Sequence, residues 1–299
     1  MLQRLAAKLI RLYGYPQEYL CCAPDALDGR VQWSIDGGSV DAQDIAMLGY
    51  RPLILAVPGL SAEHPHVLEL RIGQRLIARM TLIAALQKGD RSGKLFVGSA
   101  PWQRFLPAWK DVLDRMRQQI NQQRAGNVTN GLGEYDLLRI GYAHPRPISL
   151  AVVGTPEIGN VFPTDLNGRS GEDHFLSLRH AGKACAQVQG RGRVVLCRMP
   201  LEQAGLVYAL GQRHMKELGP LQDVLPWSGT AAGHAIPRDA LSLLDLEVRE
   251  HADIGIHRVF RCRRVNERVI LEGYTLAHVH AAVLAALGRE GRSVPVRTH

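Results

Sequence analysis

Short apolar runs separated by turn residues make up most of this chain, and they constrain its fold more than any other feature. Beyond residue 131 most runs alternate polar and apolar residues or are rich in β-branched residues, which is typical of strands. The predicted strands are YDLLRIGY, ISLAVVGT, HFLSLRHA, ACAQVQG, RVVLCRM, SLLDLEVREHADI, HRVFRCRRV and RVILEGYTLAHV. The segment LEQAGLVYALGQRHMKEL has helical spacing instead. Many short strands with one or two helices predict a closed β-barrel.

The region before residue 131 is also rich in predicted strands. RVQWSI, RPLILAVP, VLELRIGQRLIARMTLIAAL and KLFVG are separated by the turn segments DGG, PGLSAEHP and KGDRSG. Residues 101–123 change to a spacing of three and four, which predicts an amphipathic helix. Its apolar stripe consists of Phe105, Trp109, Val112, Leu113, Met116 and Ile120. We expect this stripe to be buried, either against the small β-rich unit of residues 30–100 or across the barrel.

The segment RAGNVTNGLGE is the best candidate boundary, because its Gly and Asn residues interrupt the helical pattern. It predicts two regions: residues 1–130, β-rich and of unknown role, and residues 131–299, the barrel domain. The opening MLQRLAAKLIRLYGYP places Leu2, Leu5, Leu9 and Leu12 on one helical face. That pattern fits a membrane-surface helix or a helix that docks on the protein's own body, and we favour docking. No internal repeat is evident.

Composition narrows the possible partners. The formal net charge of +8 is spread along the chain, which favours small anionic ligands. No nucleic-acid-binding motif accompanies the charge, so we expect no nucleic-acid partner, and a charge-driven association is the least favoured alternative. The five cysteines lack metal-ligand spacing and are expected to be reduced thiols, with no metal site. The sequence shows no membrane span or signal peptide, and a cytoplasmic location is expected.

Residues 144–168, HPRPISLAVVGTPEIGNVFPTDLNG, begin as an apolar strand and continue as a predicted loop dense in small polar residues and glycine. Such a loop can present backbone N–H and C=O groups at close range to a polar ring edge. It can also be an ordinary hairpin connection whose Asn and Asp side chains bond to their own backbone.

Residues about 132–272 resemble the flavin reductase-like, FMN-binding split-barrel family. The resemblance rests on the quoted stretch with its T-x-x-x-G-N core, on HFLSLRHAGKACAQV and RVVLCRMPLEQAGLVYALGQRH, and on LEVREHADIGIHRVFRCRRV with its Gly-x-His. It implies a mainly β fold with α-helices, in which a split β-barrel follows the smaller N-terminal region. It also implies a flavoprotein that binds FMN, or FAD, and acts as an NAD(P)H-dependent flavin reductase or related oxidoreductase. A homodimer and an electron-acceptor protein are further expected partners.

The resemblance also implies site residues. The residues expected at the flavin ring are Thr155, Gly159, Asn160, Phe162, Pro163, Thr164 and Asp165. The family's Ser-rich and Pro-Pro segment is absent, so the phosphate contacts are reassigned to Ser177, Arg179, His180 and Lys183, which could instead form a solvated basic turn. His257 is the expected catalytic residue. Its usual acidic neighbour is replaced by Ile254 or Ile256, and Cys262 replaces a small residue. These departures motivate an alternative function, a non-catalytic flavin-binding module used for assembly or sensing.

Overall fold

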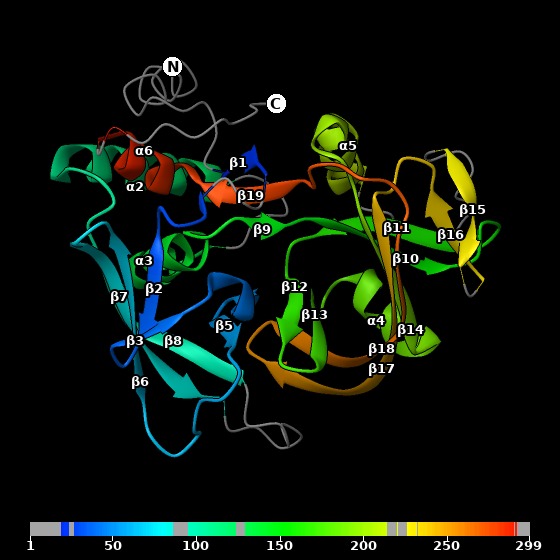
Figure 1. Ribbon diagram of the computed structural model, residues 1–299, viewed down its shortest axis with the longest axis horizontal. Helices are drawn as coiled ribbons and strands as arrows, with labels where there is room; N and C mark the ends of the chain where they lie inside the picture. Colours follow the sequence, from blue (N-terminus) through cyan, green and yellow to red (C-terminus); the bar gives the residue numbers. More distant parts are fainter. Residues whose placement is uncertain are drawn as a thin grey trace.

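The computed structural model describes residues 19–23, 27–85, 95–123, 129–213, 220, 226–231, 233–289 and 291 (Figure 1). The predicted docking helix at the start of the chain lies outside these residues, as do residues 124–128 of the predicted boundary. Among the described helices, none is both long enough and apolar enough to cross a membrane.

The second half of the chain forms one curled antiparallel sheet, called the second sheet here. Its strand order is β11-β10-β14-β17-β18-β13-β12. The strands are β10 (Ser149–Gly154), β11 (Gly159–Thr164), β12 (Asn167–Ser170), β13 (Asp173–Arg179), β14 (Arg193–Arg198), β17 (Ser242–Ile254) and β18 (His257–Val269). Helix α4 (Lys183–Arg191) packs against this sheet, and its Val188 shares a core with Val153, Leu246 and Phe260. This arrangement confirms the predicted mainly β fold and the split barrel.

The first half of the chain forms another seven-stranded antiparallel sheet, called the first sheet here. Its order is β3-β2-β6-β7-β8-β5-β4. The strands are β2 (Gln32–Ile35), β3 (Gly38–Val40), β4 (Ala46–Tyr50), β5 (Leu53–Ala56), β6 (His66–Ile72), β7 (Arg75–Ala84) and β8 (Leu95–Gln103). Five of its strands coincide with the runs predicted from the sequence.

The two sheets have the same topology. In each, the first strand along the chain pairs with the second and the fifth, the third pairs with the fourth, the fourth pairs with the seventh, and the fifth to seventh form a meander. The second sheet differs by helix α4 between β13 and β14 and by an insertion between β14 and β17. The insertion holds α5 (Ala204–Arg213), β15 (Trp227–Ala231) and β16 (His234–Pro237). The chain therefore contains a structural repeat that the sequence does not reveal.

The two sheets meet through equivalent strands. Strand β4 ends the first sheet, β12 ends the second, and β4 contacts both β12 and β13. The approach is close, because a Cβ atom added at Gly168 would lie 2.6 Å from the Cβ of Ala46. An apolar cluster with members from both sheets fills the contact; it includes Ala46, Leu48, Ile54, Phe175, Ile254 and Val259.

A small third sheet and two helices tie the halves together further. Strands β1 (Tyr19–Cys22), β19 (Ala277–His280) and β9 (Arg146–Pro147) pair in that order. Helices α3 (Leu132–Gly141) and α6 (Ala281–Arg289) contribute to the core of the first sheet through Leu137, Leu138, Ile140, Val283, Leu284 and Leu287. The division at residue 131 stays a prediction, but this core contains residues from both sides of it.

Helix α2 (Ala108–Gln122) forms within the predicted segment, but the predicted apolar stripe is fully buried only at Phe105, which precedes the helix, so the prediction is wrong for α2 itself. Trp109 is 56%, Val112 57% and Met116 42% exposed, whereas Asp114, Arg117 and Gln118 are buried. Asp114 lies between Arg117 and Arg139 of α3, and the hydroxyl of Tyr135 donates to it over 2.7 Å. Because each buried charge has a partner of opposite sign, the charged face of α2 can form the buried side.

Three further local predictions are wrong. YDLLRIGY and ACAQVQG were predicted as strands, and they form most of helices α3 and α4. Glu134 caps α3 by accepting from the Gly131 N–H over 2.7 Å, which favours a helix start at that point. Residues 159–168 are not a loop: Gly154, with φ of 91°, begins a tight turn, after which β11 pairs with β10 along its whole length.

Candidate functional site

The residues expected at the flavin ring are distributed along β11 rather than gathered on one loop. Asn160 is 2% exposed and donates to Gln187 of α4 over 2.7 Å, while Thr155 accepts from the Ile158 N–H in the hairpin turn. Thr164 ends this six-residue strand, which begins at Gly159. In an extended chain the Cα atoms of these two residues lie roughly 17 Å apart. The structure therefore brings Pro163, Thr164 and Asp165 together and separates them from Thr155, Gly159 and Asn160.

A cavity of about 270 Å³ lies at the Thr164 end of β11. Pro163, Thr164 and Asp165 line it, so three of the predicted ring residues share one pocket. Its remaining walls come from before β10, from α5 and from β19: Ile148, Val207, Tyr208, Gly211 and His278. The pocket thus combines apolar walls with a few polar groups, which is the usual composition of a small-molecule site.

A chain of hydrogen bonds runs along the pocket wall. The Asp165 carboxylate accepts from the Tyr142 hydroxyl over 3.0 Å and lies 3.1 Å from Nδ1 of His278. Nε2 of His278 bonds to the Tyr208 hydroxyl, which lies 3.2 Å from Sγ of Cys21. Burial tends to raise the pKa of Asp165, but the bond from His278 and nearby positive charge hold that pKa below its usual range. The carboxylate is therefore ionised and fixes the orientation of the imidazole.

The sequence did not indicate this chain of groups. Residue 165 and residue 278 are far apart along the chain, and β19 brings His278 to the pocket only by pairing with β1 and β9. The single signal was the pair of histidines in AHVH, which had no recognisable partner pattern.

Three of the four predicted phosphate residues lie on one surface turn. Arg179 ends β13, and His180 and Lys183 follow it at the N-terminus of α4, all three exposed. Ser177 is different, because it is 1% exposed. The Ser177 N–H donates to the Leu166 carbonyl over 2.9 Å, so β13 runs beside the residue that follows Asp165. Along this path the Arg179 backbone lies on the order of 10 Å from that of Asp165.

His257, the predicted catalytic residue, is fully buried. Its Nε2 accepts from the Tyr50 N–H over 3.3 Å, its Nδ1 lies 3.4 Å from the Ser177 hydroxyl, and the Tyr50 ring lies edge-on at 4.5 Å. Burial, with the charges of Arg179 and His180, lowers the pKa of His257 to about 4. The imidazole is therefore neutral at neutral pH and covered by the first sheet. Its catalytic role stays a prediction.

The buried His257 predicts acid lability. Its pKa is about 4 in the folded state against 6.5 ordinarily, so the unfolded chain binds more protons between these values. Stability is therefore retained above pH 6.5 and lost as the pH falls toward 4, by up to about 3 kcal/mol. We expect His257→Gln to flatten the dependence of the unfolding free energy on pH over this interval, in chemical denaturation. The exposed His64→Gln is the control, and an equal flattening by both variants would contradict the assignment.

Asp36, His64 and His66 also lie close together, with their potential ligand atoms within 4.8 Å of one another. Nδ1 of His66 lies 2.6 Å from the Asp36 carboxylate, and Nε2 lies 2.8 Å from the Ser61 carbonyl. Both ring nitrogens therefore face oxygen acceptors, and the hydrogen bonds raise the pKa of His66 although burial opposes them. This geometry is that of an ion pair that fastens the β2–β3 turn to β6.

No protein-family model matches the chain, and no curated protein matches its sequence. Solved structures are similar to it. BorF, the flavin reductase component of a bacterial two-component tryptophan halogenase, is 15% identical, with a TM-score of 0.43, over 50% of this chain and 94% of that chain. An FMN-binding protein from Thermus thermophilus is 21% identical, with a TM-score of 0.39, over 49% of this chain and 79% of that chain. The NADH:FAD oxidoreductase SgcE6 of Streptomyces globisporus is 10% identical, with a TM-score of 0.43, over 53% of this chain and 96% of that chain.

These proteins are flavin reductases and FMN-binding proteins, and each match covers about half of this chain. In this chain, the curled seven-stranded second sheet fits the split barrel that the sequence resemblance implied.

Proposed function

We propose that the protein binds FMN, with the phosphate at the basic turn of Arg179, His180 and Lys183 and the ring toward Thr164 and Asp165. The observation that carries the proposal is the basic turn, where three exposed side chains that can carry positive charge meet the N-terminus of α4. Guanidinium and ammonium groups and helix N-termini all favour phosphate. The separation of this turn from Asp165 is comparable to the length of a ribityl chain.

Only some of the predicted residues are suited to contact FMN directly. Arg179, His180 and Lys183 suit the phosphate, and the pocket at Pro163, Thr164 and Asp165 suits part of a ring. Asn160 and Ser177 are buried and already in contact with Gln187 and His257, so they would support the site without touching the cofactor. A bound flavin would supply hydride and electron transfer, and the protein would supply binding and orientation.

Two candidate functions remain within this proposal. An NAD(P)H-dependent flavin reductase is the function that the resemblance implies. A flavin-binding module without turnover is favoured by one observation, the burial of His257 beneath Tyr50 of the same chain. Oxidation of NADH and NADPH with added FMN separates them, because a module binds flavin and oxidises neither nucleotide. FAD as the flavin, the homodimer, the acceptor protein and the cytoplasmic location stay predictions.

Titration with FMN and with riboflavin tests the phosphate assignment. The double variant Arg179→Gln, Lys183→Gln should weaken FMN binding at least about tenfold, because charge-assisted hydrogen bonds to phosphate contribute about 1.5–3 kcal/mol each. Riboflavin lacks the phosphate, so its affinity should not change. Arg191→Gln, at the opposite end of α4, is the matched control. Wild-type protein that binds neither FMN nor FAD would refute the proposed function, and equal losses for FMN and riboflavin would refute the phosphate assignment.

A further inference from the structure

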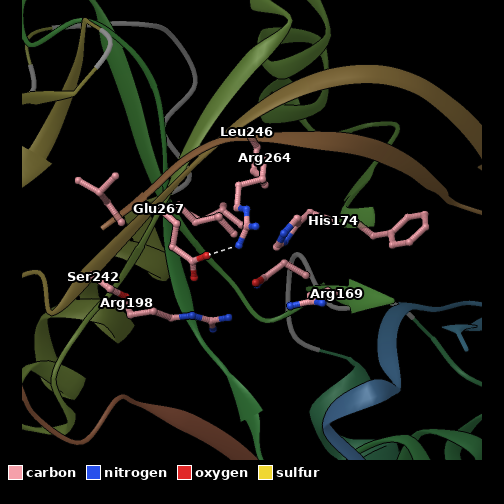
Figure 2. Close-up of a pocket in the computed structure, with 13 residues that line it drawn as sticks. Arg169, His174, Arg198, Ser242, Leu246, Arg264 and Glu267 are labelled. Carbon is pink, nitrogen blue, oxygen red and sulfur yellow. Dashed lines mark hydrogen bonds and ion pairs between the residues drawn. The ribbon is translucent and has the colours of Figure 1, made fainter. Parts of the chain in front are cut away.

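A second cavity, of about 210 Å³, lies within the second sheet, and its lining combines apolar side chains with a group of four basic ones. Figure 2 shows the side chains of Arg198, Arg264 and His174 directed into the same space, with Arg169 beside them. They come from β14, β18, β13 and β12 respectively. Arg169 and His174 are direct cross-strand partners, so the strand pairing itself brings basic groups together.

The positive charge of this cavity is only partly balanced. Three arginines and one glutamate line it, which leaves 3 − 1 = +2 with His174 neutral. Nη1 of Arg264 donates to Glu267 over 2.6 Å, so the single carboxylate already has a partner. Arg169 donates to the Gly171 carbonyl over 2.6 Å and lies 3.6 Å from Glu172, which is 93% exposed.

Arg198 has the least balanced charge in the cavity. Its Nη1 atom is buried and has no hydrogen-bond partner among the described residues. Burial lowers the pKa of Arg198 to about 10, so the guanidinium remains charged at neutral pH although its environment disfavours the charge. A buried donor without a partner and a desolvated cation are both costly, and a bound anion would relieve both costs.

We propose that this cavity is a binding site for a small dianionic oxyanion, a phosphate or phosphate monoester in the first place, held by Arg198, Arg264 and Arg169. Arginine is suited to this role because its planar fork of donors matches the oxygens of phosphate and carboxylate groups. The charge of +2 matches a dianion, and the volume is below the range typical of pockets for larger cofactors. The site is separate from the proposed flavin site, and this inference does not depend on it.

Calorimetry and thermal unfolding with inorganic phosphate test the proposal at constant ionic strength. Phosphate is expected to bind the wild type and raise its Tm. In Arg198→Met the affinity should fall at least about tenfold, since a charged hydrogen-bond donor to the anion is lost. Without phosphate this variant should be at least as stable as the wild type, because it removes a half-buried guanidinium whose buried Nη1 atom has no partner among the described residues.

The control is Arg263→Gln, the neighbour of Arg264 on β18, which lies outside the cavity and bonds to Glu247 over 2.6 Å. It should bind phosphate as the wild type does. Succinate tests whether a dicarboxylate replaces phosphate, and acetate tests whether a single charge suffices. Failure of both phosphate and succinate to bind the wild type, or an unchanged response in Arg198→Met, would overturn the proposal. FMN titration of Arg198→Met should match the wild type, which keeps the two sites distinguishable.

Discussion

Replacing Asp114 by Asn is expected to lower the free energy of unfolding by about 3–5 kcal/mol, the usual cost of breaking a buried ion pair. The side chains of Asp114 and Arg139 are fully buried, and Arg117 is 4% exposed. Burial tends to raise the pKa of Asp114, but His280, Arg139 and Arg117 hold that pKa below its usual range. Asn keeps the shape and removes the charge, so two buried guanidinium groups lose the carboxylate they share. Urea denaturation followed by circular dichroism measures the loss.

A matched control is Glu69→Gln, which breaks an ion pair between Glu69 and Arg71 on the surface of the first sheet. The pair has a distance of 3.1 Å, and its side chains are 26% and 41% exposed. It should cost no more than about 1 kcal/mol, because exposed ion pairs contribute little. If Asp114→Asn costs as little as this control, the buried charges do not determine how α2 packs.

The class of fold could be predicted from the sequence because strand signals are local. ISLAVVGT became β10, every residue of which is buried, and HFLSLRHA contains most of β13. The order of these runs, with the T-x-x-x-G-N and Gly-x-His motifs, was sufficient to indicate a split barrel. Helices α3 and α4 were missed because ten and nine residues give only a short sample of helical spacing.

The orientation of α2 could not be predicted from local sequence signals. An apolar stripe indicates a buried face when apolar contacts decide the packing. For α2 the deciding groups are Arg139 and Tyr135, which belong to α3 and approach Asp114 only in the folded chain. The pocket at Thr164 could not be predicted for the same reason, because β19 brings His278 to Asp165 only in the folded chain.

The repeat was also hidden in the sequence. A shared strand order needs only runs of suitable length and turns in corresponding places, and these can persist without residue identity. The two sheets then meet through β4 and β12, so one chain encloses an interface between equivalent halves. His257 is buried beside that interface by Tyr50 of the first sheet. Its burial is thus a consequence of the repeat, which no motif within residues 132–272 could indicate.

A fragment that begins at Gly131 is expected not to fold cooperatively, since its second sheet, α3 and α6 all lose partners. Besides three alanines, six buried apolar residues on α3 and α6 belong to the core of the first sheet. At about 1.5–3 kcal/mol for each buried side chain, their exposure removes roughly 9 kcal/mol or more, which is comparable to the entire stability of an ordinary domain. The fragment would also expose Phe175, Ile254 and Val259, which pack against Ala46, Leu48 and Ile54.

Thermal unfolding and hydrogen exchange of fragment 131–299 measure this dependence, and fragment 1–130 supplied as a separate chain is the control. Alone, fragment 131–299 should show no sharp transition and little amide protection in β13 and β18. Together, the two fragments should recover both, because the contacts across β4 and β12 and the strand pair β1–β19 need no covalent link. A cooperative transition of fragment 131–299 near the wild-type Tm would instead show that the second sheet is an independent domain, and that its contacts with the first sheet contribute little to its stability.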